Sequence, residues 1–314
     1  MTARITVVGS LNMDLVVCSP RIPRPGETII GSGFRHVPGG KGANQAVAAA
    51  RLGAQVSLVG RVGQDGFANS LLENLAADDV DHTFVIQDRE VATGVALIVV
   101  DDAGQNTIVV ASGANMRLSP TDVQAAEAVI AGADALLLQL ESPLETVLRA
   151  AQVARAHQVK VILNPAPARA LSAELLALVD VLIPNESETV LLTGMPVGSQ
   201  AEAKAAADAL LRRGVGSVIL TLGEQGALLA QEAGPHLFPA FDVTPVDTTA
   251  AGDAFVAGLA VALAESKPLA EAVRWGNAAG ALATTKLGAQ SSLPTRRALE
   301  MFLAEGRYLL NIPG

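Results

Sequence analysis

The residues best suited to chemistry form one short segment near the C-terminal third of the chain. Ala250, Ala251 and Gly252 precede Asp253, and an apolar helix is predicted over 255–263. Such a helix start leaves backbone N–H groups unpaired at the positive end of the helix dipole, and small side chains let an anion approach them. Asp253 would be a carboxylate beside this anion site, as phosphoryl transfer to a hydroxyl requires. The same residues also suit an ordinary capped helix, so both interpretations stay open here.

A second candidate segment is the glycine-rich turn at 38–45, which precedes a helix predicted over 46–52. It is not a phosphate-binding P-loop, because Lys41 is followed by glycine rather than Ser or Thr, and it lacks the dinucleotide-binding spacing. Gly40 permits close backbone approach, while Lys41 and Asn44 supply donors suited to hydroxyl groups. The turn therefore indicates a site for a polar small molecule.

Polar side chains also follow several apolar segments that are predicted to be strands. These side chains are Asn12, Asp14, Glu141, Asn185, Glu188 and Thr221. Each one is explicable as a turn or cap residue. In open α/β sheets, however, ligands bind at the carboxyl ends of the strands, so the collection of polar groups at one sheet edge favours a binding site.

The elements that would position these groups alternate regularly from residue 119 onward. Helices are predicted over 120–131, 143–156, 200–213 and 269–284, and strands over 5–9, 56–60, 135–140, 159–163, 179–183 and 217–221. Nearly continuous apolar strands between helices predict an α/β fold with a mostly parallel sheet covered on both faces. Segments 14–18 and 28–37 and a hairpin over 93–100 and 107–111 break the alternation, which predicts a small separate sheet.

Composition excludes several classes of protein. The net charge of −9 argues against a nucleic-acid-coating surface, and aromatic residues make up only 3% of the chain. One cysteine, Cys18, forbids an internal disulfide, and with four histidines a zinc cluster is not expected. No secretory signal pattern or apolar run of membrane-spanning length is present, so a soluble cytoplasmic protein is the expectation.

A further turn over 285–292 follows the last predicted helix. Its backbone carbonyls, together with Asp247, could cage a bare monovalent cation. A simple helix end with Gly288 in the left-handed conformation explains the same residues. Both interpretations remain open from the spacing.

Together, Gly39–Asn44 and Asp247–Asp253 resemble the two signatures of the ribokinase-like (PfkB) carbohydrate kinase family. Further matching segments are 9–14, 25–27, 139–143, 164–168, 184–188 and 288–290. The resemblance covers essentially the whole chain. It implies one three-layer α/β sandwich over 1–314, with a small β-sheet lid built from strands within about 12–37 and 91–112.

The activity implied by the resemblance is ATP-dependent phosphorylation of D-ribose at the 5-hydroxyl, which gives D-ribose 5-phosphate and ADP. Asp253 would be the general base, and the amides of Ala250, Ala251 and Gly252 would form the anion hole. The alternatives are a kinase for another substrate, such as 2-deoxyribose or a nucleoside, and a non-catalytic sugar-binding protein of the same fold. A dinucleotide-dependent oxidoreductase is disfavoured because no fingerprint follows the first strand.

The resemblance also implies roles for other residues. The pentose hydroxyls would be held by Asn12, Asp14, Gly40, Lys41, Asn44 and Glu141, beside Asp253. The Mg²⁺–phosphate assembly would be positioned by Asn185 and Glu188. The nucleotide groove would be lined by Thr221, Gly223, Gly226 and Gly252, with Asn277 near the adenine. An activating K⁺ would be held, mostly through backbone oxygens, by Asp247, Thr249, Ala283, Lys286, Gly288 and Ser292.

Two expectations complete the comparison with the family. The lid would close over the sugar and make the contact of a homodimer. Ala250 stands where the wider family often has glycine. Alanine suits that position only if its backbone avoids positive φ, so a negative φ is expected.

Overall fold

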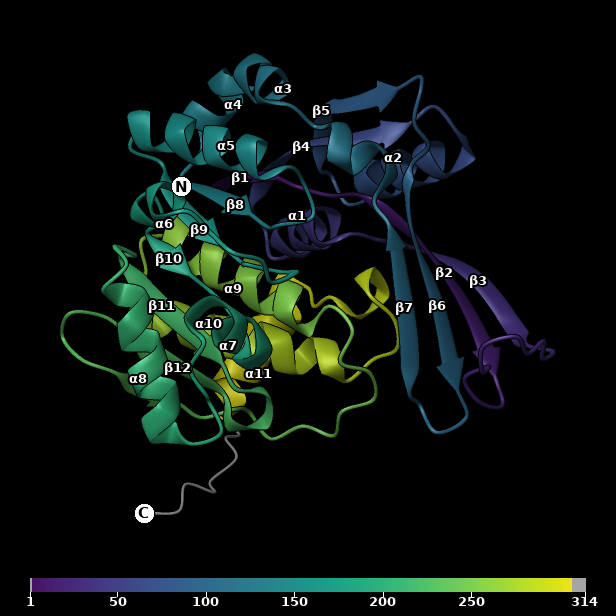
Figure 1. Ribbon diagram of the computed structural model, residues 1–314. Helices are drawn as coiled ribbons and strands as arrows, with labels where there is room; N and C mark the ends of the chain where they lie inside the picture. Colours follow the sequence, from purple (N-terminus) through teal and green to yellow (C-terminus); the bar gives the residue numbers. More distant parts are fainter. Residues whose placement is uncertain (1, 307–314) are drawn as a thin grey trace.

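The computed structural model describes residues 2–306, which form two separate β-sheets with helices packed around the larger one (Figure 1). The larger sheet has nine strands in the order β13-β12-β11-β10-β9-β8-β1-β4-β5. Their bounds are β1 Arg4–Val8, β4 Gln55–Gly63, β5 Asp81–Asp88, β8 Ala135–Leu138, β9 Lys160–Leu163, β10 Val181–Leu182, β11 Ser217–Thr221, β12 Ala227–Ala230 and β13 His236–Phe238.

Neighbouring strands from β5 to β11 run parallel, which confirms the predicted mostly parallel sheet. Their carboxyl ends therefore meet at one edge, as the argument from strand-end residues requires. Two differences from the predicted sheet were found. β12 and β13 add an antiparallel edge, and β5 extends the other edge beyond β4.

Helices cover both faces of this sheet, and each face has its own hydrophobic core. One face carries α1 Lys41–Arg51, α2 Gly66–Ala77, α9 Ala251–Ala264, α10 Leu269–Thr284 and α11 Arg296–Glu305. The other carries α3 Pro120–Ala125, α4 Glu127–Ala131, α5 Leu144–Ala156, α6 Ala173–Ala177, α7 Glu186–Thr193 and α8 Gln200–Leu211. Side chains of β1 alternate between the two cores, with Val7 in one and Val8 in the other, as the pleat demands.

Two helices begin earlier than their apolar patterns predict. α1 starts at Lys41 rather than 46, and α9 starts at Ala251 rather than 255. The reason is that apolar periodicity reports burial against the sheet, whereas the first turn of each helix consists of small or polar residues. Those first turns supply side chains and amides to the candidate site instead of to the core. The single helix predicted over 120–131 is also two short helices that meet at Ala126.

The smaller sheet confirms the predicted insertion and has the order β3-β2-β6-β7. Its strands are β2 Asn12–Ser19, β3 Ser32–Gly39, β6 Gly94–Asp101 and β7 Asn106–Ala111. In Figure 1 it projects away from the larger sheet, and its strands connect directly with β1, α1 and the 3₁₀ helix η1 Gly113–Arg117. Asn12 and Asp14 thus lie on a strand of the small sheet rather than in a loop after β1. Within residues 2–306, no helix has both the length and the apolar character needed to cross a membrane.

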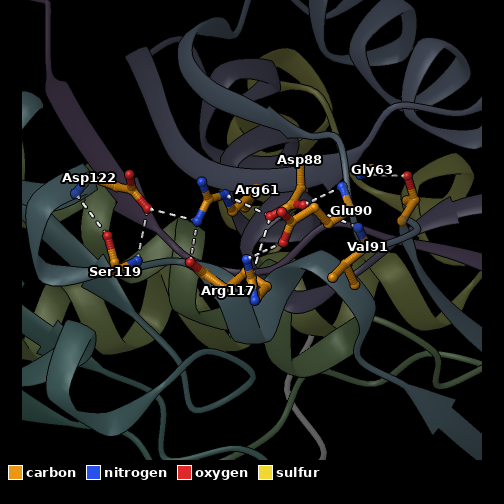
Figure 2. A network of polar contacts seen from close by, with 9 residues as sticks. Arg61, Gly63, Asp88, Glu90, Val91, Arg117, Ser119 and Asp122 are labelled. Atoms are coloured by element: carbon orange, nitrogen blue, oxygen red, sulfur yellow. Dashed lines mark hydrogen bonds and ion pairs between the residues drawn. The ribbon is translucent and has the colours of Figure 1, made fainter.

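A network of charged side chains braces the region where the β6–β7 hairpin leaves the main body (Figure 2). Arg61 of β4 lies between Asp88 and Asp122, with nitrogen–oxygen distances of 3.5 Å to each carboxylate. Arg117 of η1 reaches Asp88 at 3.6 Å and Glu90 at 3.0 Å. The network joins β4, β5, η1 and α3, so it fixes the two segments from which the hairpin starts and to which it returns.

Arg61→Ala is expected to lower the urea midpoint clearly more than Arg155→Ala does. Arg61 is the central cation of a shielded network, whereas the ion pair of Arg155 with Asp180 is largely exposed and such pairs contribute little. Equilibrium urea unfolding, followed by circular dichroism, measures both midpoints. Equal midpoints for the two variants would contradict a bracing role for the network.

Candidate active site

A cavity of about 220 Å³ lies at the carboxyl edge of the parallel sheet, beside the first turn of α9. The predicted site residues that line it are Lys41, Asn185, Glu188, Thr221, Ala250, Gly252 and Asp253. They come from both sheet faces and from chain segments more than 200 residues apart. A larger hollow of about 470 Å³ lies around Arg4, Gln55 and Asp81, but none of the predicted site residues lines it.

The turn before α9 has an open amide, although one expectation about it is wrong. Ala250 adopts the left-handed conformation, with φ 58° and ψ 9°, where a negative φ was expected. Local hydrogen bonds hold it there: its carbonyl accepts from the N–H of Ala254 at 2.9 Å, and the N–H of Ala251 donates to Thr248 O at 3.2 Å. Gly252 N–H has no acceptor among residues 2–306, and a methyl group at Gly252 would meet no atom within 4 Å. Of the three predicted anion-hole amides, the one on Ala251 is thus already engaged.

Asp253 is almost fully buried, at 5% exposure, yet both of its carboxylate oxygens have donors. Oδ2 accepts from Asn44 Nδ2 at 2.9 Å, and Oδ1 accepts from Gln45 Nε2 at 3.0 Å. Burial raises the pKa of the Asp253 carboxyl, while the charge of Lys41 and the two amide bonds act in the opposite direction. The result is a poorly solvated carboxylate, which is the kind of group that accepts a proton readily.

Lys41 lies among carboxylates at the start of α1. Burial acts to lower the pKa of its ammonium group, but the charges of Asp253, Glu141 and Glu188 outweigh this and raise the pKa overall. Lys41 therefore stays charged. For Glu188, burial raises the pKa, assisted by Asp253 and opposed by the Asn185 N–H and Lys41.

The predicted sugar-binding residues meet at the junction of β1, β2, α1 and the end of β8. Gly40 has φ 89°, and a side chain there would meet Asn12 N at 2.6 Å, so only glycine lets these two segments approach. Glu141 Oε2 accepts from Lys41 N–H at 3.1 Å and from Ser10 Oγ at 2.5 Å, which places this carboxylate at the positive end of α1. Ser10 was not predicted as part of the site.

Asn115 is a second residue that sequence reasoning missed. It is buried in η1, accepts from Leu11 N–H at 2.9 Å, and donates to Leu11 O at 2.9 Å and Asn12 Oδ1 at 2.8 Å. These three bonds fix Asn12 at the root of β2. No local sequence signal marks this role, because the partners are more than 100 residues away.

Asp14 is another carboxyl group of the site whose pKa is raised. Burial, then the charges of Glu141 and Asp253, raise the pKa of Asp14 to about 7. A side chain on Gly39 would meet Asp14 Oδ2 at 2.5 Å, so the absence of one makes room for the carboxylate. Asp14 therefore exchanges its proton near neutral pH in the ligand-free protein.

Asn185 and Glu188 form a capping box at the start of α7. Asn185 N–H donates to Glu188 Oε2 at 2.8 Å, Asn185 Nδ2 donates to Oε1 at 3.0 Å, and Glu188 N–H donates to Asn185 Oδ1 at 2.8 Å. The capping interpretation of this pair is therefore correct. Because both residues also line the cavity, capping and a role toward phosphate are compatible.

The predicted nucleotide residues do not all meet in one place. Thr221 lines the cavity, and its backbone pairs with that of Asn185 in a parallel bridge. Gly223 and Gly226 lie in the following turn, outside the cavity. Asn277 on α10 is buried and donates to Phe238 O and Pro239 O, both at 3.3 Å. In this structure the Asn277 amide thus holds the end of β13.

The predicted cation turn is organised by the Asp247 carboxylate. Its Oδ1 accepts from Thr249 N–H at 2.9 Å and Thr249 Oγ1 at 2.6 Å, and its Oδ2 accepts from Gly288 N–H at 2.8 Å. Burial would raise the pKa of Asp247, but these hydrogen bonds and the charge of Arg35 lower it. Ala283 lies in the last turn of α10, and Lys286 N–H reaches its carbonyl at 3.5 Å. Ser292 lies in the 3₁₀ helix η3 Gln290–Ser292. No group of three or more His, Cys, Asp and Glu side chains suited to a metal ion occurs in the described part of the chain.

Asp14→Asn is expected to stabilise the ligand-free protein at pH 8 but much less at pH 5. Because folding raises the pKa of Asp14 to about 7, the folded state binds this proton more tightly than the unfolded state does. The resulting penalty on stability grows as the pH rises from about 4 to 7, and is full above 7. At pH 8 the gain should be on the order of 2–4 kcal/mol.

Thermal unfolding at both pH values measures the gain, with Asp102→Asn in the exposed β6–β7 turn as the control. If the stability of both variants depends on pH in the same way, folding does not raise the pKa of Asp14 as predicted.

Comparison with known proteins agrees with this geometry. The family of pfkB carbohydrate kinases matches residues 2–296. Ribokinase of Haemophilus influenzae is 45% identical over 303 residues, which cover 96% of this chain and 99% of that protein. Deoxyribokinase of Salmonella typhi is 38% identical over 302 residues, covering 96% and 98%.

Two solved structures of ribokinases share the fold of this chain. The structure of Arabidopsis thaliana ribokinase complexed with ribose and ATP has a TM-score of 0.89 at 34% identity and covers 96% of this chain and 99% of that one. The ribokinase from Thermotoga maritima has a TM-score of 0.87 at 40% identity, with coverage of 96% and 99%. With a match over nearly its whole length, a shared fold and a carboxylate beside an open helix amide, this chain belongs to the pfkB family of carbohydrate kinases.

Proposed function

We propose that this protein transfers the γ-phosphoryl group of ATP to the 5-hydroxyl of D-ribose. The observation that carries the proposal is the buried Asp253 carboxylate, held by two amides next to the open N–H of Gly252. A base and an anion cradle within one helical turn are what transfer to a hydroxyl needs. The relatives named ribokinase, at 40–45% identity, support ribose as the acceptor.

In the proposed step, Asp253 removes the proton from the 5-hydroxyl as its oxygen attacks the γ-phosphorus. The bond from γ-phosphorus to the bridging oxygen breaks, and ADP leaves with those electrons. Negative charge on the transferred oxygens would be met by the amide of Gly252 and by the ammonium of Lys41, with the amide of Ala250 beside them. The Ala251 amide would join only if its bond to Thr248 O opens.

Magnesium is proposed to accompany ATP. The oxygen atoms of Asn185, Glu188 and Thr221 at the cavity wall suit a hard divalent cation and its water shell. Mg²⁺ bound to the phosphates would supply neutralisation of their charge. On the nucleotide side, Gly223, Gly226 and Asn277 would border the groove that leads away from Thr221, with Asn277 nearest the adenine.

The chief alternative is a different sugar, because deoxyribokinases are also among the relatives. Asn12, Asp14, Asn44 and Glu141 favour a hydroxyl-rich acceptor, and sites built to bind a hydroxyl reject analogues that lack it. ADP release measured across ribose, 2-deoxyribose, a hexose and a nucleoside separates these cases. A specificity constant for 2-deoxyribose or the nucleoside above that for ribose would overturn the proposed substrate.

Asp253→Asn should fold and bind ribose, yet lose about 10²–10⁴ in kcat, or roughly 3–5 kcal/mol of transition-state stabilisation. The amide keeps the shape of the side chain but cannot accept the proton. Steady-state kinetics with titration calorimetry for ribose measures both properties, and Asp208→Asn on α8 is the matched control. Near-normal turnover by Asp253→Asn would remove it as the base.

A monovalent cation and a dimer are two further proposals. We infer that K⁺ binds the paired turns around Asp247, since that carboxylate already ties them together; equal turnover in K⁺ and Na⁺ would refute this. The small sheet carries exposed apolar side chains at Phe34, Leu97, Ile108, Val109 and Val110, which favour burial against a second copy of this chain.

Val109→Asp is therefore expected to convert a homodimer into monomers. Val109 lies directly opposite Leu97 in the β6–β7 ladder, so the new carboxylate would lie beside Leu97 on the same face of the small sheet. Sedimentation equilibrium measures the mass, with Met301→Asp on α11 as a control at another exposed apolar residue. A monomeric unsubstituted protein would refute the proposed contact outright.

A further inference from the structure

Two chains of amide side chains, all buried except the half-buried Asn74, end on the carboxylate of Asp253. In the shorter chain, Gln139 Nε2 donates to Gln45 Oε1 at 2.5 Å, and Gln45 Nε2 donates to Asp253 Oδ1 at 3.0 Å. In the longer one, Asn74 donates to Gln290, Gln290 donates to Asn44, and Asn44 donates to Asp253 Oδ2, over distances of 2.6, 3.1 and 2.9 Å. None of these amides except Asn44 has a role in the proposed reaction.

The direction of the shorter chain is imposed by Asp253. A carboxylate only accepts hydrogen bonds, so Gln45 must turn its NH₂ group toward it and its oxygen toward Gln139. Gln139 must then turn its own NH₂ toward Gln45, which leaves Gln139 Oε1 buried near Gly9 without a donor. Reversing the amides would place oxygen against carboxylate. Gln139 Oε1 is thus left without a donor, and in return the NH₂ group of Gln45 faces Asp253.

Gln45 differs from Asn44 in what else it touches. Its side chain is completely buried and does not line the cavity, whereas Asn44 is proposed to hold the sugar. Besides its bonds to Asp253 and Gln139, Gln45 makes one further hydrogen bond within residues 2–306, a long one of 3.4 Å from Nε2 to Asn164 Oδ1. The shorter bond, to Asp253 at 3.0 Å, is therefore the main route by which Gln45 can affect the reaction.

We propose that Gln45 is a positioning residue, which holds the Asp253 carboxylate in one orientation and in its ionised form for removal of the substrate proton. The inference rests on the proposed function of Asp253 as base. A donor to the carboxylate favours the charged form, as does Lys41 on α1. Burial favours the protonated form, and so do the carboxylates that face Asp253, namely Glu141 after β8, Glu188 on α7 and Asp14 on β2. These effects outweigh the opposing ones and raise the pKa of Asp253, so the hydrogen bond from Gln45 is one of the few contacts that favour the ionised form.

Gln45→Met tests the proposal, because methionine keeps the length and volume but has no donor. Losing the donor raises the pKa of Asp253 further, so the acid limb of kcat/KM should move to higher pH by about one unit. At a pH on the unsubstituted protein's acid limb, the rate should fall about tenfold and recover at higher pH. The KM for ATP should change less than about twofold, since the Gln45 side chain does not itself line the cavity.

Two other variants guard against a merely structural explanation. Thr146→Val removes one buried hydrogen bond, from Thr146 Oγ1 to Leu118 O at 2.7 Å, on the opposite face of the sheet. It should lower the melting temperature without moving the acid limb. Gln139→Met removes the next link and the unsatisfied oxygen together, so it should fold and shift the limb in the same direction by a smaller amount.

A measurement on the free protein separates this inference from the proposed activity. The Asp253 carboxyl carbon is titrated by ¹³C NMR, and its resonance is assigned by its loss in Asp253→Asn. An upward shift of this titration in Gln45→Met supports the inference even if the sugar panel rejects ribose. An unchanged titration and acid limb in Gln45→Met and Gln139→Met would overturn it even if ribose kinase activity is confirmed.

Discussion

The bonds from α1 to the Asp253 carboxylate are the constraint on which the rest of the site depends. They join residues 44 and 45 to residue 253, across 209 and 208 positions of sequence. The two helices can approach this closely because α1 buries mainly alanine on the face that it shares with α9. Ala48 lies one turn after Asn44 on the same side of α1, and a larger side chain there would separate the helices and break the amide–carboxylate bonds. Close packing of small residues therefore allows the amides of α1 to reach the Asp253 carboxylate.

Charge is distributed unevenly around this point of contact. Asp253, Glu141 and Glu188 act on a single ammonium group, that of Lys41. Asp14 adds a fourth carboxyl group close to Glu141 and Asp253. The free site is thus short of positive charge, while the proposed substrate brings several negative charges. One open amide and one lysine would not balance them, which gives a physical reason for a divalent cation to accompany ATP. The raised pKa of Asp14 belongs to the same imbalance, because protonation of one carboxyl relieves it.

Much of this arrangement was predictable from the sequence, and the rest was not for identifiable reasons. Apolar strands alternating with helices predicted the parallel sheet, and the hairpin around residues 101–105 predicted the small sheet. β5 was missed because its side chains alternate in exposure without forming a strongly apolar face. The β12–β13 edge was missed because nothing in the local sequence distinguishes antiparallel from parallel pairing. Asp253 and Asn44 were found because local motifs mark them. Gln45 and Asn115 were missed because their partners are distant in sequence. The condition that alanine at position 250 must avoid positive φ was wrong, because residue preference alone does not account for the hydrogen bonds within residues 248–254.

The division of the proposed sugar site between two sheets has a mechanical consequence. Asn44 and Asp253 belong to helices on the large sheet, whereas Asn12 and Asp14 belong to β2 of the small sheet. A rotation of the small sheet about its root would carry Asp14 away from the sugar while leaving the base and its amides in place. The bonds of Asn115 to Leu11 and Asn12 hold that root, so Asn12 should move less than Asp14, two residues further along β2. At the proposed site, sugar binding and the position of the small sheet would therefore be coupled mainly through Asp14, because a ligand shifts an equilibrium only through contacts that differ between its two states.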